Sequence, residues 1–235
     1  MKLHYETIST EMKEVMIQLM AVEEFNSFRL VGGTSLALQL GHRVSVDLDF
    51  FAGGGIDTRT IAGTIRNNFG ESALITRVLQ NGINAVINGI KVDIYDWKVP
   101  FAKPPLIVDG IRLASVEDLF ANKCEALIDR KSEKDFCDIA EIFKHIKLPL
   151  LIPTLKQRYA FISLGAIFTI LIKENAIIKD ETIKLLKGNT FEKYFILVKK
   201  ELKEYEESIQ KRKKIESEKR DERIRLLIEQ KRKNK

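Results

Sequence analysis

Apolar and polar positions follow a helical period at the start of the chain. Ser9 and Thr10 are residue types that favour a helix N-terminus, and apolar residues then recur at intervals of three and four positions. This spacing predicts a first helix that ends near Phe25. The apolar positions of that helix are Met12, Val15, Met16, Leu19 and Met20.

A short strand, a tight turn and a short helix are predicted next. Residues 28–31 form an apolar run that ends in Gly32 and Gly33. Residues 34–40 then follow a helical pattern that Gly41 stops, because glycine favours the end of a helix. The order strand, turn, helix therefore occupies fewer than twenty residues.

The middle of the chain has the shorter period of β-strands. Residues 46–51 are mainly β-branched and aromatic, and three glycines close this run. Farther on, Asn-Gly and Asp-Gly pairs separate short apolar runs, which is a strong signal for hairpins. We expect an antiparallel meander and one further hairpin. The runs of the meander are 73–79, 83–87 and 90–97, and those of the hairpin are 106–108 and 111–113.

Helical patterns return in the second half of the chain. Ser115 and Asp118 resemble a capping box that opens a helix to about Arg130, and a second helix is predicted over 133–146. Pro149 and Pro153 then interrupt the pattern, so we place a domain boundary there, with a first domain over 1–150 and a second over 151–235. Residues 199–235 carry 15 basic and 9 acidic side chains and predict a long, solvated, basic helix.

Length and composition indicate a globular protein with one or two domains. The chain has 235 residues, of which 45% are hydrophobic and 31% charged. Its two cysteines are too few for a disulfide framework, and its start lacks the apolar stretch of a signal peptide. The longest apolar run, 160–172, is too short to span a membrane. We therefore expect a cytoplasmic protein without a membrane segment.

The charge is distributed unevenly along the chain. Residues 1–155 carry 17 basic and 20 acidic side chains, a balance of −3, whereas residues 156–235 carry 22 and 13, a balance of +9. A basic segment of this kind suits a polyanionic partner, because each cation placed against a phosphate releases condensed counterions. The same pattern is also typical of a solvated helix, and the sequence leaves both interpretations open.

Two aspartates in the predicted strand 46–51 form the sharpest candidate site. Asp47 and Asp49 lie two positions apart, so their carboxylates point to the same face of the strand. Adjacent carboxylates repel each other unless a cation lies between them, and Mg²⁺ prefers such oxygen ligands. Asp93, in the alternating strand 92–96, is the candidate third carboxylate, with Asp96 as the alternative. The pattern predicts a metal site.

The turn before the short helix supplies the second half of that site. Glycines at 32 and 33 let the backbone approach a ligand closely, and the N-terminus of the following helix offers free N–H groups to a phosphate. Three carboxylates beside a phosphate cradle would suit two Mg²⁺ ions that activate a hydroxyl and stabilise a leaving pyrophosphate.

At this point the sequence resembles a known family. Gly-Gly-Thr, a short helix, Asp-x-Asp and a later strand aspartate resemble the polymerase-beta-like nucleotidyltransferase superfamily. Residues 31–51 are similar, almost residue for residue, to the AbiEii/AbiGii toxin family. The resemblance covers roughly residues 25–145. Its later part consists of Glu117-Asp118-Leu119, Lys123, Ala126-Leu127, Arg130 and Lys134-Asp135-x-x-Asp138.

The resemblance implies an α/β (α+β) fold: a nucleotidyltransferase core with a mixed, antiparallel-rich sheet flanked by helices, followed by an α-helical domain with a long basic helix. It also implies a toxin of a bacterial toxin–antitoxin or abortive-infection system. Relatives transfer nucleotides from NTPs to the 3′ end of tRNA. The implied reaction is Mg²⁺-dependent transfer of a nucleoside monophosphate from an NTP, GTP or CTP, to RNA, with a cognate antitoxin as partner.

The resemblance also assigns roles to particular residues. Metal ligands would be Asp47, Asp49 and Asp93, and Asp93 could instead be the base. The catalytic set would also contain Lys123 and Asp135. Binding of the nucleotide would involve Gly32, Gly33, Thr34, Arg43 and Lys123. For Lys123 and Arg130 a solvated helix face remains an alternative, and Asp135 and Asp138 could simply pair with neighbouring cations.

Two other functional classes remain open from the sequence. The acceptor could be a protein or small-molecule hydroxyl instead of RNA. The protein could also be a non-catalytic module that binds NTP or a partner. The basic charge of the C-terminal segment favours a polyanionic acceptor. Its charge runs contain no aromatic residue, so contact with phosphates and not base stacking would be its role in binding RNA.

Overall fold

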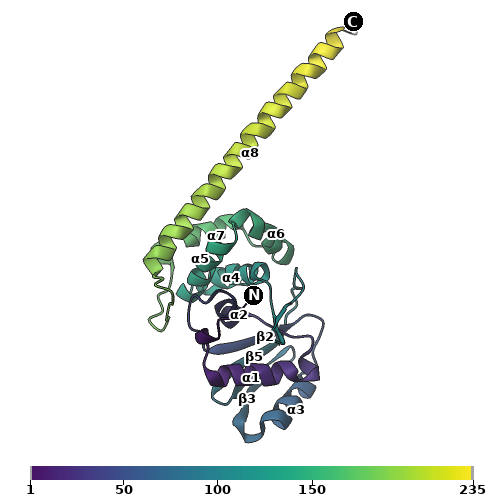
Figure 1. Ribbon diagram of the computed structural model, residues 1–235. Coiled ribbons are helices and arrows are strands. Elements are labelled where there is room, and N and C mark those ends of the chain that lie inside the picture. Colours follow the sequence, from purple (N-terminus) through teal and green to yellow (C-terminus); the bar gives the residue numbers. More distant parts are fainter. Residues whose placement is uncertain (1, 234–235) are drawn as a thin grey trace.

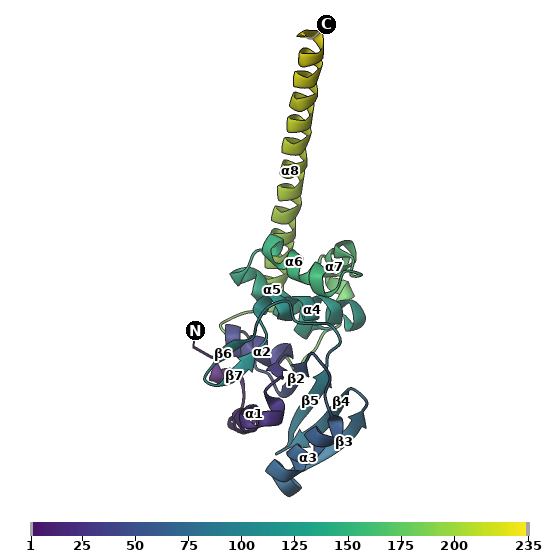
Figure 2. The ribbon, with the colours of Figure 1, turned by 90° about the vertical axis from the view of Figure 1, so that its right-hand side faces the viewer.

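The computed structural model describes residues 2–233, which form a sheet-containing part and a helical part (Figure 1). In both views the helical part lies on one side of the sheet-containing part, and the last helix extends away from it (Figures 1 and 2). The α-helices are α1 (Thr10–Ala21), α2 (Gly32–Leu40), α3 (Thr58–Phe69), α4 (Val116–Arg130), α5 (Glu133–His145), α6 (Leu148–Arg158), α7 (Leu164–Leu171) and α8 (Phe191–Lys233).

The sheet is mixed and mainly antiparallel, as expected. Seven strands follow the order β3-β4-β5-β2-β1-β7-β6. Only the pairs β2·β5 and β1·β7 are parallel among the strands described. The meander β3-β4-β5 and the hairpin β6-β7 confirm the pairings that the Asn-Gly and Asp-Gly turns predict. The strands are β1 (Arg29–Leu30), β2 (Asp47–Ala52), β3 (Ala73–Leu79), β4 (Gly82–Ile87), β5 (Ile90–Asp96), β6 (Leu106–Val108) and β7 (Ile111–Leu113).

Two hydrophobic cores meet at the short helix α2. The first core packs α1 and α3 against the strands, and it includes Leu38 of α2. The second core is built from α4 to α8, and it includes Leu36 and Leu40 of α2. Because residues on both sides of α2 are buried, this helix is fixed between the two parts, and the loop at its N-terminus has a defined position.

The predicted boundary at residue 150 falls inside α6, so the prolines do not separate two folding units there. Pro149 occupies the first turn of α6, where its missing N–H costs no hydrogen bond, and Pro153 is accommodated within the helix. Leu151 and Leu155 are buried in the same core as α4 and α5. The chain instead passes from the first core to the second between β7 and α4.

One helix lies where we predict none from the sequence. Helix α3 begins after Asp57, whose carboxylate accepts a hydrogen bond from the N–H of Arg59. Its buried positions Ile61, Ile65 and Phe69 are spaced by four residues. The signal for this helix was therefore present, but short and embedded in a polar segment.

Helix α8 is longer than the predicted helix over 199–235, because it begins at Phe191. Its first turns carry a buried stripe of Tyr194, Val198 and Leu202 that packs into the second core. At 43 residues the helix is ~65 Å long, and its distal part is exposed (Figure 2). None of the helices in residues 2–233 combines the length and apolar character needed to cross a membrane.

A segment between α7 and α8 is hydrogen-bonded to the end of α2 and to the loop that leads from α2 into β2. The N–H of Val44 donates to the carbonyl of Lys184, and the N–H of Leu186 donates to the carbonyl of His42. The ammonium of Lys187 donates to the carbonyl of Leu40 at the end of α2. We call residues 180–187 the clasp segment, because it holds the loop that leads from α2 into β2.

Candidate active site

Strand β2 places two carboxylates on the face of the sheet opposite the first core. Leu48 and Phe50 are fully buried in that core, so Asp47 and Asp49 point to the other face. Strand β5 runs parallel to β2 and places Asp93 directly beside Asp49 in the register. The three carboxylates that we predict as metal ligands thus lie at neighbouring positions of β2 and β5.

Asp93, and not Asp96, belongs to this group. One oxygen of Asp93 accepts from the amide of Asn84 at 2.6 Å, and the other pairs with Lys91 at 2.8 Å. Asp96 lies three positions along β5, where its carboxylate accepts from the backbone N–H groups of Gly54 and Gly55. Its role is to hold the glycine loop that follows β2.

The crowding of negative charge is strongest at Asp49. Burial, followed by repulsion from Asp93 and Asp47, raises the pKa of Asp49 from 3.8 to about 6, although Lys123 opposes this effect. A carboxyl group in this state gains most from an added cation, because the protein itself leaves part of the local negative charge unneutralised.

Two glycines are required where the chain turns from β1 into α2. Gly32 has a φ of +67°, and a Cβ there would overlap the carboxylate of Asp49. A Cβ at Gly33 would overlap the guanidinium of Arg43. The N-cap residue Val31 provides no side-chain hydrogen bond to α2. The helix N-terminus therefore presents its backbone N–H groups and positive dipole end beside the carboxylates.

The hydroxyl of Thr34 is hydrogen-bonded within the protein. The side chain of Thr34 is buried, and its hydroxyl donates to the carbonyl of Asp47 and is also hydrogen-bonded to the hydroxyl of Ser45 at 2.8 Å. The side chain therefore does not face the pocket, and it fixes the backbone that leads into β2. Any contact of Thr34 with a phosphate would have to come from its backbone N–H.

A buried ion network joins the two parts of the molecule behind the site. Asp138 of α5 accepts from Nε of Arg43 at 2.7 Å and pairs with Lys123 of α4 at 2.7 Å. Asp135 pairs with the same ammonium at 2.9 Å and with Nε of Arg130 at 2.6 Å. Three cations thus share two carboxylates.

The network keeps all of its members charged. Burial alone would raise the pKa of Asp138, but Arg43 and Lys123 hold it well below 3.8. Burial would lower the pKa of Lys123, but Asp138 and Asp135 raise it instead. The predicted residues Lys123 and Arg43 therefore line the same pocket as the carboxylates on β2, with their charges already paired. The predicted residue Asp135 lies behind them and does not line the pocket. Asp138 is the residue that the prediction of site residues omits.

The three strand carboxylates, the two glycines and the cations of the network line a pocket of about 450 Å³. The clasp segment contributes to it through Asp180, which pairs with Lys134 at 2.9 Å, and through Lys184. No sequence motif marks the clasp segment, and it reaches the pocket only through the fold. The other charged residues of the lining are Arg43, Asp47, Asp49, Lys91, Asp93, Lys123 and Arg130.

The donor set suits a hard cation. Within residues 2–233, no three His, Cys, Asp or Glu side chains are already drawn together around a common point. The candidate ligands are all carboxylate oxygens, which Mg²⁺ prefers, and Asp49 carries unneutralised charge. Lys91, which holds one oxygen of Asp93, is 57% exposed, so this ion pair costs little to open. The residues present therefore fit a magnesium ion.

The fold and the site together are those of the nucleotidyltransferase class. The chain belongs to the AbiEii nucleotidyl transferase toxin family, which is described as part of a type IV toxin–antitoxin system, and the match covers residues 14–222. An uncharacterized protein from Aquifex aeolicus (strain VF5) is 27% identical over 142 residues, which are 56% of this chain and 65% of that protein. The chain thus spans about 65% of the length of this relative.

Solved structures show the same fold. MenT4, a nucleotidyltransferase toxin from Mycobacterium tuberculosis, has a TM-score of 0.59 and 16% identity, with 82% of this chain and 80% of MenT4 covered. JHP933 from Helicobacter pylori has a TM-score of 0.53 and 16% identity, with 87% and 96% covered. At these identities the likeness concerns the fold.

Asp49→Asn is expected to stabilise the metal-free protein at pH 7. In the wild type, the folded state keeps the Asp49 proton to about pH 6 whereas the unfolded state loses it near pH 4, so this group lowers stability as pH rises through that window. The difference between the variant and the wild type should grow from pH 4 to pH 6 and reach on the order of 1–3 kcal/mol.

Urea denaturation in the presence of a chelator at several pH values measures this difference. Asp221→Asn, at an exposed carboxylate on distal α8, is the matched control and should show no such trend. A difference for Asp49→Asn that is independent of pH would contradict the assignment.

Asp138→Asn is expected to destabilise the fold by about 3–5 kcal/mol, because it leaves Arg43 and Lys123 buried with one carboxylate fewer. Chemical denaturation measures the loss. Glu207→Gln, which removes an exposed pair with Lys203, should change stability by less than about 1 kcal/mol. Equal effects of the two substitutions would show that the network does not hold the two parts together.

Proposed function

We propose that this protein is a Mg²⁺-dependent nucleotidyltransferase toxin. It transfers a nucleoside monophosphate from an NTP, GTP or CTP, to the 3′-hydroxyl of an RNA, with the tRNA 3′ end as the acceptor. A cognate antitoxin protein is its partner. One observation carries the proposal: Asp47, Asp49 and Asp93 lie on adjacent parallel strands, next to a helix N-terminus that no side chain caps.

The parts of the pocket divide the work of binding the NTP. The backbone N–H groups at Gly33 and Thr34 and the dipole of α2 favour the phosphates. Cations on the rim, Lys91, Lys134 and Lys184, add positive potential around the pocket. Lys123 and Arg43 act from behind, since Arg43 supports the turn at Gly33 and their network keeps its positive charge next to the carboxylates.

In the proposed reaction, the acceptor 3′-oxygen attacks the α-phosphorus of the NTP. A bond forms between these two atoms as the bond from the α-phosphorus to the bridging oxygen breaks, and pyrophosphate leaves. The hydroxyl proton passes to a carboxylate oxygen of Asp93, beside Asp49. Asp47 and Asp49 would hold Mg²⁺, which when bound offsets the triphosphate charge and lowers the pKa of the hydroxyl.

Two features support RNA as the acceptor. Residues 211–235, which include the distal part of α8, carry 12 basic and 5 acidic side chains, and the side chains described there are exposed. A helix of this charge that projects from the body can contact phosphates without any rearrangement of the core. The pocket itself is also rimmed by cations, which suits two polyanionic substrates.

The transfer reaction is tested with purified protein, Mg²⁺, total tRNA and each α-labelled NTP in turn. We expect label on tRNA, and a loss of more than about 100-fold for Asp47→Asn and for Asp49→Asn, because each removes a metal ligand. Label on a protein or on a small molecule, and not on tRNA, would show that the acceptor is not RNA. No transfer, with NTP binding intact, would favour a non-catalytic binding module.

Truncation after Gln210 is expected to weaken RNA binding without unfolding the protein. Up to that point α8 retains its buried residues and the pairing of Glu201 with Lys147, whereas the described side chains beyond it are exposed. The affinity for tRNA should fall about tenfold or more, and its dependence on salt between about 50 and 200 mM should become shallower. Filter binding measures both quantities.

The control for this truncation is NTP binding, which should stay unchanged because the pocket lies in the folded body. An unchanged affinity for tRNA with an unchanged salt slope would show that distal α8 does not contact RNA.

A further inference from the structure

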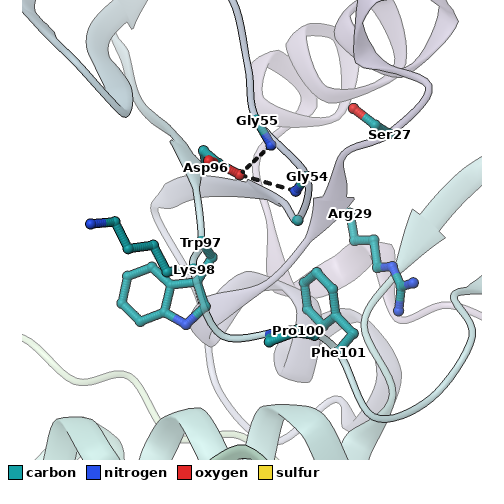
Figure 3. Close-up of a pocket in the computed structure, with 10 residues that line it drawn as sticks. Ser27, Arg29, Gly54, Gly55, Asp96, Trp97, Lys98, Pro100 and Phe101 are labelled. Atoms are coloured by element: carbon teal, nitrogen blue, oxygen red, sulfur yellow. Dashed lines mark hydrogen bonds between the residues drawn. The ribbon is translucent and has the colours of Figure 1, made fainter.

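A second cavity, of about 580 Å³, lies where β2 and β5 end (Figure 3). The glycine loop after β2 forms one wall, and the segment after β5 forms another, with Trp97, Lys98 and Phe101. Arg29 of β1 reaches the cavity beside Phe101. Its volume falls within the range of small-molecule sites, and it is not part of the pocket that contains the carboxylates.

A smaller hollow shares lining residues with both pockets. This hollow, of about 210 Å³, shares Gly32, Asp49 and Lys123 with the active-site pocket, and it shares Trp97 with the second cavity. Phe51, two residues after Asp49, faces the same side of β2 as Asp49 and stacks on Trp97. This ring pair therefore marks a path from the carboxylates to the second cavity.

The aromatic walls of this path are held rigidly. The ring of Trp97 stacks on Phe51 with a centroid distance of 4.6 Å and an interplanar angle of 10°. The indole N–H donates to the hydroxyl of Tyr159 at 3.2 Å, and that hydroxyl donates to Asn122 at 3.0 Å. Because these bonds fix the ring before a ligand arrives, stacking a base near it costs little side-chain entropy.

The cavity also contains cations suited to a phosphate. The guanidinium of Arg29 lies over the ring of Phe101 at 4.2 Å and donates one N–H to the carbonyl of Lys103. Burial lowers the pKa of Arg29, which marks a cation that has lost part of its hydration. Lys98 is exposed at the cavity, whereas the carboxylate of Asp96 is bonded to the glycine loop. The available charge is therefore positive.

We propose that the second cavity binds a nucleotide of the acceptor RNA close to its 3′ end. The base lies against Trp97, and the phosphate lies against Arg29. The active-site pocket, which has its own phosphate cradle at Gly33, then remains for the NTP. This assignment rests on the proposed function, because it supplies the binding site for the second substrate of the same reaction.

Trp97 is the only tryptophan in the sequence, so its fluorescence reports on the cavity directly. We expect a short single-stranded RNA with a free 3′-hydroxyl to quench this fluorescence saturably in the full-length protein without Mg²⁺. A stacked base is the cause of the quenching. An unchanged signal at RNA concentrations that saturate binding would overturn the proposal.

A substitution that fills the second cavity tests the site through the affinity for RNA. At Gly53, which lines the cavity, an added Cβ meets only the carbonyl of Trp97 at 3.8 Å, so Gly53→Leu places a side chain at the cavity without a clash. The Kd and the KM for RNA should rise about tenfold or more, and the KM for NTP should change less than about twofold. Lys98→Glu should raise the same two constants for RNA.

The matched control is Gly63→Leu on α3, where an added Cβ meets no atom within 4 Å and which lies outside the cavity. This variant should bind RNA and NTP as the wild type does. Unchanged RNA constants for both Gly53→Leu and Lys98→Glu would overturn the proposal even if transfer occurs. A selective rise in the KM for NTP would also overturn it, and would assign the cavity to the donor base.

The same experiments distinguish failure of the proposed transfer reaction from failure of the RNA site. If no nucleotide is transferred but RNA still quenches Trp97, and Gly53→Leu weakens that binding, the second cavity stands as an RNA site. If a peptide or protein acceptor quenches Trp97 and RNA does not, the cavity is not a nucleotide site.

Discussion

The site depends on one buried carboxylate. Asp138 binds Arg43, which lies beneath the turn before α2, and Lys123, which comes from the helical part. A buried ion pair of this kind adds little net stability compared with apolar packing, but it is costly to break. Its effect here is positional: it sets the distance between α2 and α4, and so the width of the pocket between them.

The same arrangement explains why the pocket combines close packing with unneutralised charge. The network neutralises the acids of α5 with cations from α4 and from the loop before β2. Fewer cations neutralise the acids of β2 and β5. Asp49 therefore keeps a raised pKa next to a lysine whose charge is already shared by two carboxylates. Stability is lost at the carboxylates, and the capacity to bind a cation and a triphosphate is gained.

The local parts of the site could be predicted from the sequence, because they are encoded by spacing. Asp47 and Asp49 share a face through the period of a strand, and Gly32 and Gly33 mark a turn that no other residue fits. The sequence could not show that the hydroxyl of Thr34 is bonded to the carbonyl of Asp47, because that contact depends on how α2 packs. It also could not separate Asp93 from Asp96, which the register of β2 with β5 decides. The two prolines also did not reveal helix α6 in the sequence, because Pro149 is compatible with the first turn of a helix.

The clasp segment has a consequence for the synthesis of the protein. Domains fold as they leave the ribosome, beginning with the N-terminal part. The carboxylates of β2 and β5 are present early, but the loop that leads into β2 is held by Lys184 and Leu186, and the pocket includes Asp180. The nascent chain therefore lacks a complete pocket until residues 180–187 have been translated.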